Sequence, residues 1–342
     1  MRTILGTRSL AAKPPAPVIP QPRPQTWPAS AACVWSLAYG VLGLFWAFGG
    51  GGFPYGESDA GAGLSILTGF RADAAGPLIA ALGLLGAVVA LAMVRPWGRG
   101  LPRPLLLGFG WSATAVLLLV VPDARALTFL GYLPALVVAV GFSSVDWPVV
   151  LNQGFCLAGG LLWGAATLTY QRGSVAPTAI SVAGPRWGRW ATYAAVLLPL
   201  PYAATRLAWA VGIPLGISDE FLATLQAEGA TTAEVSLGGM ALAGALLTLG
   251  LVQRWGEVFP GWLPVVGGKR VPPMLAILPA TLVSVVLIIG GLSLYRGWLS
   301  SGLPVEEDGW GAGMPTLAFL PWGIALGLAT YAYAERRQWD RA

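Results

Sequence analysis

The sequence predicts an all-α protein, a polytopic transmembrane helical bundle. Of its 342 residues, 56% are hydrophobic and only 10% are charged, whereas soluble globular chains carry roughly 25% charged residues. Residues 77–94 and 273–290 contain no charged side chain, and their lengths approach the ~20 residues that a helix needs to cross ~30 Å of hydrocarbon. The alternating pattern of a membrane β-barrel is absent.

Nine apolar segments are candidates for membrane-spanning helices. They are residues 31–49, 76–94, 105–121, 126–142, 149–170, 191–213, 235–253, 273–294 and 314–334. The positive-inside rule decides how many of them cross. If 126–142 does not cross and the N-terminus is cytoplasmic, 16 of the 20 lysines and arginines fall in inner segments.

About eight crossings are therefore predicted, with both termini cytoplasmic in a bacterial plasma membrane. The alternative of nine crossings inverts every later loop and places more cations outside than inside. Segment 126–142 is interrupted by Gly131 and Pro134. It is therefore predicted to be a re-entrant or interfacial helix on the outer side, where protein must cover its backbone.

Four short matches in the same order predict an internal duplication. Tyr39, Leu44, Trp46, Ala47 and Gly49 recur as Tyr202, Leu207, Trp209, Ala210 and Gly212, and GESD (56–59) recurs as GISD (216–219). Residues 86–102 match 244–260, and 164–172 match 327–335. Each repeat then has four crossings, so the two repeats are parallel and related by an axis along the membrane normal.

These matches divide the chain into four parts. Residues 1–30 are rich in proline and are predicted to form a disordered cytoplasmic tail. Residues 31–172 form the first membrane repeat, with the outer segment 122–148 inserted in it. Residues 173–190 form a cytoplasmic linker, and residues 191–342 form the second membrane repeat.

Two short motifs carry a resemblance. The W-A-x-G ending at 46–49 and the R-x-W-G-x-x-x-P turn at 95–102 resemble uncharacterised multi-pass integral membrane proteins of high-GC actinobacteria. The first motif returns at 209–212, and the second returns in part at 255–260. The resemblance implies a multi-pass membrane protein and carries no activity.

The composition restricts the possible chemistry. The chain has no histidine, so the commonest general base and metal ligand is missing. Cys33 and Cys156 fall in separate apolar segments and are predicted to be packing residues rather than a disulfide or metal site. No catalytic residue, cofactor or metal is predicted. The basic residues are dispersed among loops, so topology explains them better than nucleic-acid binding does.

Arg206 is the main candidate site residue. It lies inside segment 191–213, shortly after Pro199 and Pro201, and a charge at a helix centre costs ~3 kcal/mol on insertion scales. One interpretation is an ion pair within the bundle, with the long side chain reaching outward toward Asp219 or Glu220. The other interpretation is a site for an anion or substrate, with Tyr202, Asn152 and Gln153 as its neighbours.

A second candidate is the outer-face acidic pair Asp59 and Asp219, which occupy equivalent places in the two repeats. Such a pair binds a cation or activates water if its members meet. The alternative is structural, because Ser218 and Asp219 precede an amphipathic segment and are typical of a helix N-terminus.

The predicted function is non-catalytic handling of a small molecule or lipid, as a carrier, exporter subunit or channel. One alternative is a membrane enzyme that acts on a lipid-linked substrate at the outer face with Asp59, Asp219 and Arg206. The other alternative is a membrane scaffold or assembly partner. The expected partners are the lipid bilayer and a small-molecule or lipid substrate; no protein partner is specified by the sequence.

Overall fold

The structure is a computed structural model that describes residues 26–56, 65, 67, 69–143, 145–172, 186–262, 264, 266–301 and 309–339. The predicted tail up to residue 25, residues 173–185 of the predicted linker, and Asp59 lie outside this part. Within the described residues the regular elements are helices, accompanied by an isolated bridge between Val258 and Arg270.

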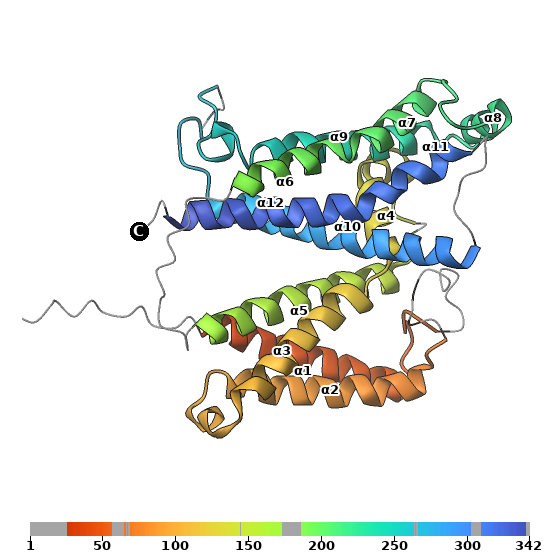
Figure 1. The fold of residues 1–342 in the computed structure, drawn as a ribbon. Helices are drawn as coiled ribbons and strands as arrows, with labels where there is room; N and C mark the ends of the chain where they lie inside the picture. Colours follow the sequence, from red (N-terminus) through yellow and green to blue (C-terminus); the bar gives the residue numbers. More distant parts are fainter. Residues whose placement is uncertain are drawn as a thin grey trace, which may run out of the picture.

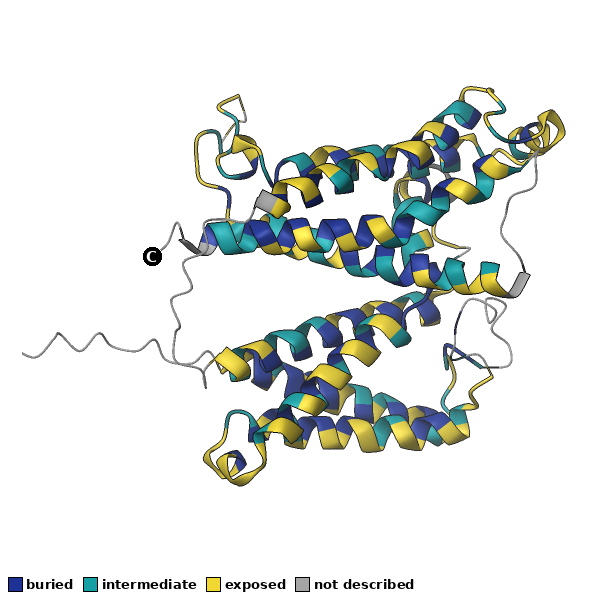
Figure 2. Cartoon of the chain, in the orientation of Figure 1, coloured by how far each residue is buried: buried dark blue, intermediate teal, exposed yellow. Residues whose placement is uncertain are grey.

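Seven helices of the described part are long and apolar enough to cross a membrane. They are Trp27–Ala47, Ala72–Ala92, Arg103–Val120, Trp147–Arg172, Thr231–Leu249, Pro273–Leu299 and Trp310–Arg337. Each overlaps an apolar segment predicted from the sequence. Exposed residues occur all along these helices (Figure 2), and many of them are large and apolar. An exposed apolar surface of this extent requires hydrocarbon as its solvent, so the chain is a multi-pass integral membrane protein.

The elements follow one another as a series of helices and short helical turns (Figure 1). They are α1 (Trp27–Ala47), α2 (Ala72–Ala92), η2 (Pro96–Gly100), α3 (Arg103–Ala115), η3 (Val116–Val120), α4 (Ala124–Ala135), η4 (Leu136–Val140), α5 (Trp147–Arg172), α6 (Arg186–Leu197), α7 (Leu200–Ala210), α8 (Asp219–Ala227), α9 (Thr231–Leu249), η5 (Arg254–Gly256), α10 (Pro273–Ser301), α11 (Trp310–Gly313), η6 (Met314–Ala318) and α12 (Phe319–Trp339). Segments η3 and η4 are π-helical, and η2, η5 and η6 are 3-10 helices.

Helices α6 and α7 lie end to end and are separated by a break at Leu198 and Pro199 (Figure 1). Pro199 has no backbone N–H and disfavours the helical conformation of the residue before it, which explains the break. The two helices, of 12 and 11 residues, span ~35 Å together at ~1.5 Å per residue. We propose them as the eighth crossing.

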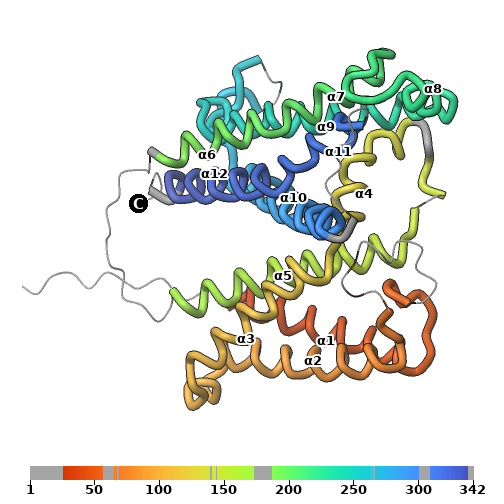
Figure 3. Tube along the Cα trace, turned by 45° about the vertical axis from the view of Figure 1, so that its right-hand side comes forward, coloured from red at the N-terminus to blue at the C-terminus, as the bar shows by residue number. Residues whose placement is uncertain are grey.

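Helix α4 lies between the rest of the helices and runs across their direction (Figure 3). It contacts α9 and α10. The Ser236 hydroxyl of α9 donates to the Gly131 carbonyl at 2.8 Å and accepts from the Ala135 N–H at 3.3 Å. Protein thus covers the α4 backbone beside Pro134, as a non-spanning segment requires.

The long helices form two groups with the same pattern of neighbours. In the first group α1 packs against α2 and α5, and α3 packs against α5. In the second group the α6–α7 pair packs against α9 and α12, and α10 packs against α12. We propose that this shared pattern arises from the duplication predicted from the sequence.

Most of the described basic residues lie at one end of the molecule, here called the cation-rich end. It contains the η2 turn with Arg95 and Arg99, the end of α5, the η5 turn and the end of α12 (Figure 1). Arginines at this end also donate hydrogen bonds to backbone carbonyl groups. Arg103 donates to the Gln171 carbonyl at 3.1 Å, and Arg337 donates to the Val271 carbonyl at 2.7 Å. The end with α8 is called the opposite end.

Candidate functional site

The first group of helices forms a partly open cavity of about 360 Å³, here called the aromatic cavity. Its inner walls are formed by α1, α2, α3 and α5, and aromatic rings from three of these helices line it. Nearly all of its lining is apolar. The lining includes Trp35, Ser36, Tyr39, Leu78, Leu82, Gly83, Gly86, Phe109, Ala113, Leu117 and Trp163. Ordinary ligand pockets begin at ~300 Å³, so this cavity has room for one small group or one chain.

Glycines explain why the space lies between α2 and α3. A Cβ added at Gly76 of α2 would lie 2.6 Å from the Ala47 nitrogen of α1, so these two helices touch backbone to backbone. On the other side, Gly164 of α5 packs against Thr114 of α3. Because α2 is held to α1 and α3 is held to α5, α2 and α3 make few contacts with each other. The aromatic cavity occupies the gap.

A second hollow of about 800 Å³ lies at the opposite end of the first group and is here called the polar cleft. It is lined by the glycines 49–52, by the start of α2 and by the start of α5. Arg71 and Asp73, which form an exposed ion pair at 3.2 Å, face it together with Asp146. The polar cleft and the aromatic cavity share Trp46, Phe53, Pro54 and Phe70 as walls.

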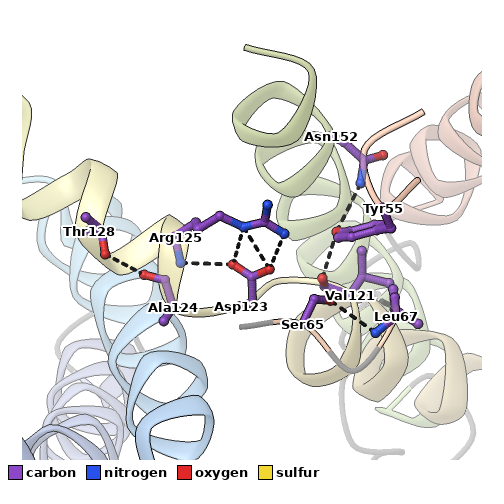
Figure 4. Close-up of polar contacts among 9 residues, drawn as sticks. All are labelled: Tyr55, Ser65, Leu67, Val121, Asp123, Ala124, Arg125, Thr128 and Asn152. Atoms are coloured by element: carbon purple, nitrogen blue, oxygen red, sulfur yellow. Dashed lines mark hydrogen bonds and ion pairs between the residues drawn. The ribbon is translucent and has the colours of Figure 1, made fainter. Parts of the chain in front are cut away.

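Hydrogen bonds hold two tyrosines that line the aromatic cavity, Tyr39 and Tyr55. The Tyr39 hydroxyl donates to Asn152 Oδ1 at 3.0 Å, and Asn152 Nδ2 donates to the Tyr55 hydroxyl at 3.3 Å. Tyr55 in turn donates to the Val121 carbonyl at 2.8 Å (Figure 4). Burial raises the pKa of the Tyr55 phenol well above its usual range, so the phenol keeps the proton that it donates.

An ion pair adjoins this network at the start of α4. Asp123 is only 2% exposed, accepts a hydrogen bond from the Arg125 N–H at 2.9 Å, and pairs with the Arg125 guanidinium at 2.6 Å (Figure 4). Asp123 therefore combines an N-cap with a charge-assisted hydrogen bond. The guanidinium lies 6.0 Å from the centre of the Tyr55 ring.

The structure brings together only some of the predicted site residues. Asn152 belongs to the network of Tyr39 and Tyr55. Gln153 is 1% exposed, and neither its amide nitrogen nor its amide oxygen has a hydrogen-bond partner among the described residues. Arg206 and Tyr202 lie in the second group of helices, where Arg206 hydrogen-bonds Glu234. A single site made of all four residues is therefore not found.

The expected partner of Arg206 was wrong. Arg206 does not pair with Asp219 or Glu220; its Nη1 atom lies 3.3 Å from Glu234 Oε2 on α9. The guanidinium carbon also lies 4.9 Å from the centre of the Tyr202 ring and 4.5 Å from that of Trp209. Glu234 is buried in the first turn of α9, one residue before the apolar segment predicted to start at 235. This contact agrees with the bundle-pairing interpretation, and the role of Arg206 as an anion or substrate site stays a prediction.

Asp219 occupies the first turn of α8, whose N-terminus is capped by Ser218. The Ser218 hydroxyl accepts a hydrogen bond from the Phe221 N–H at 3.2 Å. This agrees with the structural alternative stated above for Ser218 and Asp219, a helix N-terminus. Because Asp59 lies outside the described residues, the predicted pairing of Asp59 with Asp219 stays a prediction.

The sequence interpretation missed the aromatic residues of the cavity. Trp163 is 1% exposed and donates through Nε1 to the Ser36 hydroxyl at 3.2 Å. In the sequence, the signal for this contact is a tryptophan and a serine that lie in the middle of two apolar segments. Cys33 and Cys156 are buried and free, as predicted. Within the described residues no group of three or more His, Cys, Asp or Glu side chains is placed to hold a metal ion.

Comparisons with known proteins give no relative. No protein-family model, no curated protein and no solved structure matches the chain.

Proposed function

We propose that the protein binds a lipid-like amphiphile without transforming it, with one hydrocarbon chain in the aromatic cavity and the polar headgroup in the polar cleft. The observation that carries this proposal is the shared wall. Four residues, Trp46, Phe53, Pro54 and Phe70, line both hollows. A polar space at the end of the helices thus adjoins an apolar space that extends inward between α2 and α3.

The energetics of the bilayer assign different roles to the two hollows. A chain that leaves lipid for the cavity gains little from the hydrophobic effect, because lipid tails are as apolar as the cavity wall. Packing against Trp35, Phe109 and Trp163 contributes dispersion contacts and selects for chain shape. The headgroup contacts in the polar cleft must therefore supply most of the discrimination between lipids.

The polar cleft offers both charges and aromatic faces to a headgroup. Arg71 and Asp73 form an ion pair across the start of α2, and Asp146 adds a second carboxylate. Trp46 and Phe53 contact each other edge to face, with ring centres 5.3 Å apart. Such a lining suits a headgroup with hydrogen-bonding groups better than a purely apolar molecule.

The location of the cavity favours a carrier or an exporter subunit over a channel. The cavity lies inside one group of helices, between α2 and α3, whereas a pore for a polar solute requires a polar lining. With the cation-rich end on the cytoplasmic side, the polar cleft opens at the outer face. The bound amphiphile would then come from the outer leaflet.

Photo-crosslinking tests the proposal. The full chain is reconstituted in nanodiscs of phosphatidylethanolamine and phosphatidylglycerol that contain a phosphatidylethanolamine with a diazirine on one acyl chain. After irradiation, mass spectrometry locates the labelled residues. We expect label on Ser36 and Trp163, which are 2% and 1% exposed and which annular lipid does not reach. Label confined to exposed residues contradicts the proposal.

A matched pair of variants on α3 provides the control. Ala113 lines the aromatic cavity, whereas Ala115 is exposed and does not line it. Ala113→Phe fills the space and should abolish label on Ser36 and Trp163. Ala115→Phe adds the same ring on the lipid side and should leave that label unchanged.

A further inference from the structure

The lining of the aromatic cavity at Tyr55 is connected to the second group of helices by a continuous set of contacts. Phe53, Pro54 and Tyr55 line the cavity from the loop after α1. The Tyr55 hydroxyl holds this loop to the Val121 carbonyl. Val121 belongs to the three-residue connection between η3 and α4, so the loop is bonded to the segment that begins α4.

This connection is buried and rigidly held. Val121, Pro122, Asp123 and Ala124 are all buried, and the Asp123–Arg125 pair fixes the first turn of α4. The Arg125 guanidinium also lies over the Tyr55 ring. A shift of Tyr55 therefore changes the packing of both Val121 and Arg125.

The far part of α4 is bonded to the second group. Ser236 of α9 bridges the Gly131 carbonyl and the Ala135 N–H of α4. Leu127 of α4 packs where a Cβ on Gly290 of α10 would lie, at 2.5 Å. Leu127 and Leu130 also pack against the cluster of Leu157, Val286 and Ile289, which joins α5 to α10. Helix α4 thus contacts both groups.

We infer that Tyr55 is a latch that couples occupancy of the aromatic cavity to the contact between the two groups of helices, with α4 as the connecting element. This inference rests on the proposed function. A chain that enters past Phe53 and Tyr55 displaces the loop and breaks the hydrogen bond from Tyr55 to Val121. The start of α4 is then released, and the contacts of α4 with α9 and α10 weaken.

Hydrogen–deuterium exchange of the full chain in nanodiscs tests the latch. Tyr55→Phe removes the hydroxyl and keeps the ring. Loss of one hydrogen bond should accelerate exchange about fivefold in residues 121–126, and the coupling should also accelerate exchange in residues 231–238 of α9. Acceleration restricted to residues around 55 and 121 overturns the inference.

A second tyrosine provides a matched control. Tyr295 of α10 donates to the Leu317 carbonyl at 2.8 Å, the same type of bond at the same distance as that of Tyr55. Tyr295→Phe should accelerate exchange near 317 and leave residues 121–126 unchanged. If Tyr295→Phe accelerates exchange at 121–126 as much as Tyr55→Phe does, the effect is general loosening and the latch is excluded.

Coupling must also operate in reverse, because a coupling free energy is reciprocal. Ser236→Ala removes the hydrogen bonds between α9 and α4 and should accelerate exchange at 121–126 in the first group; unchanged exchange there counts against the latch.

The photo-crosslinking result separates the two proposals. Absence of label on Ser36 and Trp163 in the unmodified protein refutes the proposed function, whereas label there without remote exchange effects refutes only the latch.

Discussion

Arg206 of α7 and Glu234 of α9 form an ion pair at 3.3 Å at positions that, in the register proposed for the duplication, correspond to Gly43 of α1 and Gly76 of α2. In the first group a Cβ at Gly43 would lie 2.8 Å from the Gly76 carbonyl oxygen. Helices α1 and α2 thus contact each other through their backbones, whereas α7 and α9, at the corresponding places of the proposed register, contact each other through two opposite charges. In the proposed register, a backbone contact in the first group corresponds to a charge and its compensating partner in the second.

Removing one member of this pair should destabilise the protein more than removing both. Arg206 and Glu234 side chains are 15% and 6% exposed, so Arg206→Met leaves a buried carboxylate without a cation, at a cost of about 3–5 kcal/mol. The double variant Arg206→Met, Glu234→Met should recover most of that loss. Equilibrium unfolding in mixed micelles measures both. A double variant as unstable as the single one would exclude this account.

The close contact between α1 and α2 at Gly76 leads to a second prediction about stability. Gly76→Ala places a methyl group 2.6 Å from the Ala47 nitrogen, so α1 and α2 must separate and stability should fall by about 1–3 kcal/mol. Gly108 of α3 is exposed, with no atom near its Cβ position. Gly108→Ala should gain up to about 1 kcal/mol from helix propensity. Thermal unfolding of the two variants should therefore shift in opposite directions.

Hydropathy and proline placement predicted the helices because both act within one segment. The seven long helices overlap predicted segments, and the break between α6 and α7 lies at Pro199, where proline disfavours a continuous helix. The Ser218 cap of α8 was also predictable, since a cap depends on neighbouring residues.

The site could not be predicted in the same way, because its contacts join distant parts of the chain. Asn152 and Tyr55 are separated by 97 positions, and Arg206 and Glu234 by 28. The aromatic cavity depends on which helix pairs pack closely and which stay apart. Glu234 was overlooked because it precedes an apolar segment by one residue, where an acid is typical of a helix start.

Asp123 caps the N-terminus of α4 and forms an ion pair with Arg125, and substitutions can separate these two roles. Asp123→Asn keeps an oxygen that accepts from the Arg125 N–H but loses the charge, whereas Asp123→Ala loses both. We expect Asp123→Ala to lose about 1–3 kcal/mol of stability and Asp123→Asn to lose less. Both variants should accelerate hydrogen exchange at residues 124–128. Equal stability of Asp123→Ala and the unmodified protein would show that the buried pair contributes nothing.

The distribution of charges predicts the orientation of the whole molecule. Gly100 and Gly261 are exposed at the cation-rich end, and neither has an atom near its Cβ position; Glu228 is exposed beside α8 at the opposite end. Because cytoplasmic loops carry an excess of Lys and Arg, a membrane-impermeant maleimide added to intact cells should label Glu228→Cys and spare Gly100→Cys and Gly261→Cys. Permeabilised cells should show labelling of all three. The native Cys33 and Cys156 are buried, so they contribute little background. Labelling of Gly100→Cys in intact cells would reverse the orientation and place the polar cleft at the cytoplasmic face, so that the amphiphile would have to come from the inner leaflet.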